Sequence, residues 1–118
     1  MKNITNKVRL IGHIGNDPQI TSLNNGSQIL RLSIATNQNY RGPQGEPVHK
    51  TEWHQLCAWG NTAIKMHEQV SKGTQLIVDG KLNNRSYNDR NGNMRSISEI
   101  LVQDFAILAK YKPMDKTI

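Results

Sequence analysis

Residues 51–82 have the sequence TEWHQLCAWGNTAIKMHEQVSKGTQLIVDGKL, and this stretch decides the fold. Residues 51–59 and 75–82 each show the alternation of a strand. Between them, Asn61 is placed to cap a helix and Gly73 to end it. The helix is indicated by a stripe at helical spacing, formed by Ala63, Ile64, Met66, His67 and Val70. The stretch therefore predicts a strand, one short helix and another strand.

Further strand-like runs lie on both sides of this stretch, at residues 8–14, 29–36 and 97–108. Residues 15–18 break the first run, and an Asn-Asn-Gly turn at residues 24–26 precedes the second. Residues 37–50 show no apolar periodicity and include two Gly and two Pro, so we expect a mobile loop there. In the polar residues 83–96, the pair Asn91-Gly92 predicts a hairpin tip.

The order of these elements predicts the fold class. Three strands, a helix and two strands match the all-β OB-fold, a five-stranded Greek-key barrel with one short helix between strands 3 and 4. The length of 118 residues fits one domain. We assign residues 1–110 to this domain and predict a short, disordered C-terminal tail at residues 111–118.

The charge of the chain favours a polyanionic partner. Fifteen Lys and Arg residues stand against nine Asp and Glu, which gives a formal net charge of +6. Any one cation has the alternative of a solvated surface charge, but residues 85–95 combine three Arg with Tyr87. The candidates for phosphate contact are Arg31, Arg41, Lys50, Lys72, Lys81, Arg85, Arg90 and Arg95.

Aromatic residues are placed in polar or basic surroundings, where a core ring would have apolar neighbours. This pattern predicts stacking on exposed nucleobases. The candidates are Tyr40, Trp53, Trp59 and Tyr87. The alternatives are core packing for the two Trp residues, an exposed loop ring for Tyr87 and an ordinary surface side chain for Tyr40.

The sequence lacks the patterns of an enzyme, of a secreted protein and of a membrane protein. The four His residues have no metal-ligand spacing, and the single Cys57 can form neither a thiolate site nor an intramolecular disulfide. We expect no catalytic residues, no metal and no cofactor. No signal peptide and no apolar run of about 18 residues is seen, so a cytoplasmic location is expected.

Several strings in this order and spacing resemble the bacterial single-stranded DNA-binding protein (SSB) family. They lie at residues 6–18, 25–26, 33–36, 51–54, 59–60, 72–73, 79–82 and 85–89. The resemblance implies sequence-independent binding of single-stranded DNA, protecting unwound DNA in replication, recombination and repair. It also implies that the family's four stacking positions hold the rings named above. The family more often has Trp at positions 40 and 87, and Phe at position 59.

The resemblance further implies self-association. The family usually forms homotetramers, with a dimer as our second choice, and pairs its barrels through the first strand. This places Val8, Leu10 and His54 at a subunit interface, although for His54 the residues alone favour a buried, hydrogen-bonded side chain. The resemblance also implies a bacterial, nucleoid-associated protein.

Two alternatives for the function stay open. Full-length family members end in an acidic, hydrophobic tip, whereas this chain ends in a short, net basic segment. We therefore expect a short form, or one whose tail was removed, and recruitment of replication and repair proteins is in doubt. One alternative is an OB-fold adaptor of a replication-restart complex. The other is an RNA-binding OB domain, although no feature here indicates recognition of a 2′-hydroxyl.

Overall fold

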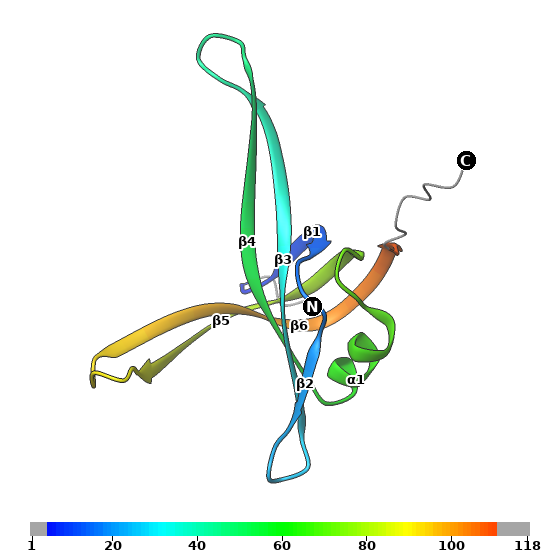
Figure 1. Ribbon diagram of the computed structural model, residues 1–118, viewed down its shortest axis with the longest axis vertical. Coiled ribbons are helices and arrows are strands. Elements are labelled where there is room, and N and C mark those ends of the chain that lie inside the picture. The colour runs from blue at the N-terminus through cyan, green and yellow to red at the C-terminus, as the bar shows by residue number, and fades with distance from the viewer. Residues whose placement is uncertain (1–4, 111–118) are drawn as a thin grey trace.

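The computed structural model describes residues 5–110, which form six strands and one helix (Figure 1). Their bounds are β1 Val8–Ile14, β2 Gln19–Ser22, β3 Gln28–Arg41, β4 Pro47–Trp59, α1 Gly60–Gln69, β5 Gln75–Asn88 and β6 Met94–Ala109. No helix in this part of the chain is long and apolar enough to cross a membrane. The predicted tail at residues 111–118 lies outside the described residues.

The strands close into a barrel. Neighbours in the sheet follow the order β1-β5-β6-β4-β3-β2, and an additional pairing of β1 with β3 completes the circle. Five strands therefore form the barrel. The sixth, β2, lies outside it and forms an antiparallel hairpin with the beginning of β3. The pairing of β4 with β6 is parallel and all the others are antiparallel. This arrangement confirms the predicted OB-fold with one helix between β4 and β5.

The core is built from alternating residues of the barrel strands and one face of α1. Ile34, Leu56, Leu76 and Val78 are at most 1% exposed, because each points to the inner face at the strand period. Ala63 and Met66 of α1 are fully buried against the same cluster. The apolar stripe of the helix is thus only partly buried, since Ile64 of the predicted stripe is 39% exposed.

Two long hairpins, β3–β4 and β5–β6, project from the barrel in different directions (Figure 1). The prediction of a mobile loop at residues 37–50 is therefore wrong. β3 continues to Arg41 and β4 begins at Pro47, with cross-strand pairs such as Asn37 with Thr51. Both faces of this ribbon lie away from the core, so it needs no apolar alternation, and the backbone ladder supplies its order. For the same reason β5 extends beyond the predicted residues 75–82.

The helix begins differently from the prediction. Gly60 has φ of +59° and makes the turn from β4 into α1. Trp59 consequently occupies the N-cap position, no side chain caps the helix, and Asn61 lies within the first turn. The helix ends at Gln69, with Val70 as C-cap, so it stops before Gly73.

Candidate nucleic-acid interface

The four candidate stacking rings are exposed. The exposed fractions are 49% for Tyr40, 58% for Trp53, 45% for Trp59 and 45% for Tyr87. The core-packing alternative for the two Trp residues is thereby excluded. Phe105, by contrast, packs against the hydrophobic core. The flat faces of these four side chains are accessible to a ligand, as stacking on bases requires.

Trp53 and Trp59 lie on one face of the β3–β4 pair. Trp53 is opposite Ala35, Trp59 is opposite Ile29, and Arg31 lies between these positions on the same face. Six residues separate the two rings along β4, which corresponds to roughly 20 Å of strand. We call this outer surface, together with Arg85 and Glu99 of the neighbouring strands, the tryptophan face.

Tyr40 does not belong to the tryptophan face. It pairs with Val48, and the register of β3 and β4 runs without a shift, so Tyr40 lies on the opposite face of the ribbon. It is also beyond the barrel, near the end of the β3–β4 hairpin. The structure therefore brings two of the predicted rings together and holds Tyr40 apart from them.

Trp53 rests against the segment that connects β1 to β2. A β-carbon added to Gly15 would overlap the end of the Trp53 ring. Beside it, the Asn16 Oδ1 accepts hydrogen bonds from the backbone N–H and the hydroxyl of Ser33, both at 2.9 Å. Sequence analysis treated this segment only as a break after the first strand-like run. The structure shows that Gly15 leaves the room that this position of the ring requires.

A groove lies beside Trp53, at the fork between β4 and the β5–β6 hairpin. β4 and β6 pair only at Leu56 with Ile100 and Cys57 with Leu101. The groove has a volume of about 260 Å³, and its lining is formed by Trp53, His54, Gln55, Leu82, Ser98, Glu99 and Ile100. Both apolar and polar side chains line this groove, a combination that suits a flat, partly polar ligand.

A second groove lies over the β2–β3 hairpin. Its volume is about 200 Å³, and its lining is formed by Gln19, Thr21, Ile29 and Arg31. Ile29 is the cross-strand partner of Trp59, so this groove adjoins that ring. Grooves therefore accompany both Trp residues of the tryptophan face.

Tyr87 lies on the β5–β6 hairpin directly opposite Arg95. The tip of this hairpin is organised by Asp89, which accepts hydrogen bonds from the Arg95 Nε at 3.0 Å and from the backbone N–H of Asn91 and Asn93 at 2.9 Å. The hydrogen bond from Arg95, followed by that from Asn93, lowers the pKa of Asp89. The Asp89 carboxylate thus holds the side chain of Arg95, the cross-strand partner of Tyr87.

Glu99 is a functional candidate that sequence reasoning missed. It is only 5% exposed, yet it lies on the outer face, where its carboxylate is 3.3 Å from the Arg85 Nε and 4.0 Å from the Arg31 Nε. The two Arg residues come from β5 and β3, so the acid faces cations from two different hairpins. Burial, and then the charge of Glu99, raises the pKa of Cys57 nearby. No short motif connects these residues, so only the fold brings them together.

The other predicted cations are distributed over several parts of the molecule. Lys50 pairs with Glu52 at 3.2 Å, and the Arg41 guanidinium donates to the Gly45 carbonyl at 3.0 Å, both on the β3–β4 hairpin. Lys81 and Arg90 are exposed, on β5 and in the β5–β6 turn. Lys72 follows α1, and its backbone N–H donates to Asp17. These five cations therefore form no single cluster.

The residues predicted at a subunit interface have contacts within the chain. Val8 and Leu10 are half-buried and pack against the core, opposite Gly80 and Val78 of β5. The Nε2 of His54 is 3.0 Å from the hydroxyl of Thr36, so this half-buried side chain is hydrogen-bonded, as the residues alone suggested.

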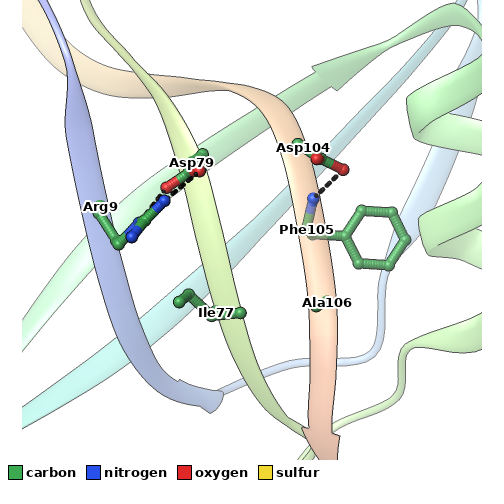
Figure 2. A pocket seen from close by; sticks show the side chains of 6 residues that line it. All are labelled: Arg9, Ile77, Asp79, Asp104, Phe105 and Ala106. Carbon is green, nitrogen blue, oxygen red and sulfur yellow. Dashed lines mark hydrogen bonds and ion pairs between the residues drawn. The ribbon is translucent and has the colours of Figure 1, made fainter.

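The outer face of β1, β5 and β6 carries a further pocket of about 180 Å³ (Figure 2). The Arg9 guanidinium donates two hydrogen bonds to Asp79 there, at 2.6 and 2.8 Å, and these lower the pKa of Asp79. None of the four candidate rings lines this pocket. The described residues also contain no group of three or more His, Cys, Asp or Glu that could hold a metal ion.

Comparison with protein families identifies one match over nearly the whole chain. The model of the single-strand binding protein family matches residues 5–108. A curated relative, single-stranded DNA-binding protein 1 of Chlorobaculum tepidum, is 35% identical over 104 residues. The match covers 87% of this chain and 64% of that protein, so the chain spans just under two thirds of this relative.

Comparison with solved structures gives the same fold. A Plasmodium falciparum SSB in complex with ssDNA has a TM-score of 0.80 and 29% identity, covering 92% of this chain and 98% of that one. A deletion mutant of the single-stranded DNA binding protein from Thermus aquaticus has a TM-score of 0.78. At 22% identity, with 87% of this chain and 50% of that chain covered, this second likeness shows the fold alone.

Proposed function

Because this chain belongs to the single-strand binding protein family, we propose that it binds single-stranded DNA without regard to sequence. The observation that carries the proposal is the exposure of Tyr40, Trp53, Trp59 and Tyr87 on one small basic domain. The family consists of non-enzymatic DNA-binding proteins. Its members protect unwound DNA in replication, recombination and repair, and we propose the same role here.

The preference for single strands follows from access to the bases. Duplex DNA hides the faces of its bases, whereas an open strand offers a face at every nucleotide. Stacking contributes about 1–3 kcal/mol per base and is tolerant of sequence, because every base has a π-face. The surrounding Lys and Arg residues add a salt-dependent attraction to phosphates.

We propose that the two Trp residues contact bases in the barrel region, that Tyr40 contacts DNA running along the β3–β4 hairpin, and that Tyr87 contacts DNA along the β5–β6 hairpin. Arg31 and Arg85 are then phosphate contacts on the tryptophan face, and Lys81 is a further one on the same strand as Arg85. Arg41, Lys50, Arg90 and Arg95 are the candidates on the hairpins, and Lys72 lies beside the segment that connects β1 to β2. The basis for this assignment is the register of the strands and the exposure of the rings.

A homotetramer is the proposed assembly, with a dimer as the second choice. Residues 8–13 of β1 pair with β5, and β1 meets β3 only at His13 and Ile14, so the edge of residues 8–12 that faces away from β5 is left for pairing. Val8 and Leu10 lie on this strand. Sedimentation of the protein alone measures the assembly, and a monomer would contradict this proposal. We further propose the bacterial cytoplasm, in association with the nucleoid, as the site of action.

Titration with poly(dT) tests the function. Quenching of the Trp53 and Trp59 fluorescence should report saturable binding, and the affinity should fall with salt at a slope of roughly −0.7 per phosphate contacted. A duplex of equal length should bind much more weakly. Equal affinity for duplex DNA would contradict the proposal, and stronger binding of poly(U) would indicate an RNA-binding domain.

A further inference from the structure

Glu99 introduces a negative charge into a surface that is otherwise suited to a polyanion. Its side chain is 6% exposed, whereas those of Arg31 and Arg85 are 51% and 43% exposed. A buried carboxylate on an anion-binding surface requires an explanation, because burial of a charge costs free energy unless the charge is paired. The two guanidinium groups supply the pairing.

The pairing is loose. The shortest contacts of Glu99 are 3.3 Å to Arg85 and 4.0 Å to Arg31. The Arg9–Asp79 pair, which joins β1 to β5, has two hydrogen bonds at 2.6 and 2.8 Å, the geometry of a tight ion pair. The two Arg residues at Glu99 are therefore held less closely than Arg9, and about half of each side chain remains exposed to another anion.

We propose that Glu99 is an internal counter-charge that competes with DNA phosphate for Arg31 and Arg85 and so lowers the affinity of the tryptophan face. The inference rests on the proposed binding of single-stranded DNA and concerns a residue that regulates it. One carboxylate against two guanidinium groups leaves a local charge of about +1, which attracts a phosphate less than two free cations would. Because Glu99 is buried, salt screens it less than a surface acid.

The position of Glu99 gives this competition a local effect. Glu99 lines the groove beside Trp53, and Arg31 lies on the same face between the two Trp positions. A strand that stacks on Trp53 must therefore pass the Glu99 cluster. Binding of DNA phosphate by Arg31 and Arg85 at this place then requires these two side chains to leave Glu99.

Replacement of Glu99 by Gln tests the proposal, because it removes the charge and keeps the shape. Glu99→Gln should bind poly(dT) about three- to tenfold more tightly at low salt, with a slope steeper by up to about 0.7 for each Arg released. Glu68→Gln is the matched control, since it makes the same change in net charge at an exposed position of α1. The control should bind nearly as the wild type does.

A second pair of variants asks whether the effect acts through the two cations. In a protein that already carries Arg31→Gln and Arg85→Gln, the change Glu99→Gln should no longer raise the affinity. A structural role of Glu99 would not depend on these two residues in this way. A gain that persists in this background overturns the proposal.

The remaining outcomes are also decisive. Weaker binding of Glu99→Gln with an unchanged slope would mean that Glu99 positions the two Arg residues, and it would overturn the competition. An equal gain of affinity in Glu68→Gln would mean that the change in net charge alone causes the effect, and it would overturn the proposal. If Glu99→Gln does not fold, Glu99→Asp, whose carboxylate is withdrawn from both Arg residues, should show a smaller gain, and no gain overturns the proposal. A wild-type protein that binds no single-stranded DNA would instead overturn the proposed function.

Discussion

The end of the Trp53 ring lies against Gly15 so closely that a β-carbon at position 15 would overlap it. One of the most exposed aromatic rings of the molecule is thus positioned by the absence of a side chain in a segment 38 residues earlier in the sequence.

Gly15→Ala should weaken DNA binding and leave the fold intact. The added methyl group must displace the end of the Trp53 ring that lies against Gly15. Because Trp53 as a whole is 58% exposed, the side chain can move at little cost to stability. The expected loss is up to about 1–3 kcal/mol of binding free energy, the contribution of one stacked base. Titration with oligo(dT) measures it. The loss should disappear in a Trp53→Ala background, and an undiminished loss there would show that Gly15 acts independently of the ring.

Tyr87→Ala should cost about 1–3 kcal/mol in affinity for poly(dT), because it removes a stacking surface. Tyr87→Phe is the matched control, since it keeps the π-face and removes only the hydroxyl group. The Phe variant should bind as the wild type does, as judged by fluorescence titration. If both variants lose the same affinity, the hydroxyl group rather than the ring makes the contact.

Tyr40→Ala should weaken the binding of long strands and spare that of short ones. Tyr40 lies on the opposite ribbon face from Trp53 and Trp59 and near the end of the β3–β4 hairpin, so a short oligonucleotide held on the tryptophan face does not reach it. Titrations with a graded series of oligo(dT) lengths reveal the length at which the variant departs from the wild type. An equal loss at every length would place Tyr40 in the same subsite as the Trp residues.

Gly60→Ala should destabilise the fold without a steric clash. Nothing lies within 4 Å of a β-carbon built at this position, but φ of +59° is unfavourable for an L-residue. The expected loss is about 1–2 kcal/mol in the free energy of unfolding. Urea denaturation measures it, and unchanged stability would mean that the turn into α1 relaxes to another conformation.

Asp89→Asn should lower the stability at neutral pH and have no effect in acid. The pKa of Asp89 is lower in the folded protein than in the unfolded chain, so its carboxylate stabilises the fold above the unfolded pKa of about 4. This contribution is lost as the pH falls through the pKa of Asp89 in the folded protein. Below that pH the Asp89 carboxyl of the wild type is neutral, as the Asn side chain of the variant is. Thermal unfolding across a pH series should show the two proteins converging at low pH. A constant difference would assign the effect to hydrogen bonding alone.

The parts of the fold that sequence predicted best are those that bury one face. Residues 51–59 and 75–82 alternate because Leu56, Leu76 and Val78 fill the core, and this alternation is visible in the chain itself. The β3–β4 hairpin beyond the barrel has no buried face, so its strands carry no such pattern. Backbone pairing with a partner strand, which a single segment does not reveal, sets its structure.

The candidate site divides in the same way. The four rings were predicted because each contrasts with its own neighbours in the sequence. Glu99 was not, because its partners Arg31 and Arg85 lie on other strands and only the barrel brings them together. Gly15 was interpreted only as part of a break after the first strand-like run, since nothing local indicates that the Trp53 ring lies against it.

The closure of the barrel has a mechanical consequence. β1 and β3 share two register pairs, and so do β4 and β6, whereas the β3–β4 and β5–β6 ladders each run for thirteen or more. The two long hairpins are therefore joined to each other through short junctions, namely the β1–β3 and β4–β6 pairings. Few hydrogen bonds close the barrel at those junctions, but Ile14, Ile34, Leu56 and Ile100 there belong to the buried core. Side-chain packing, more than the backbone ladder, therefore holds the two hairpins at their mutual angle.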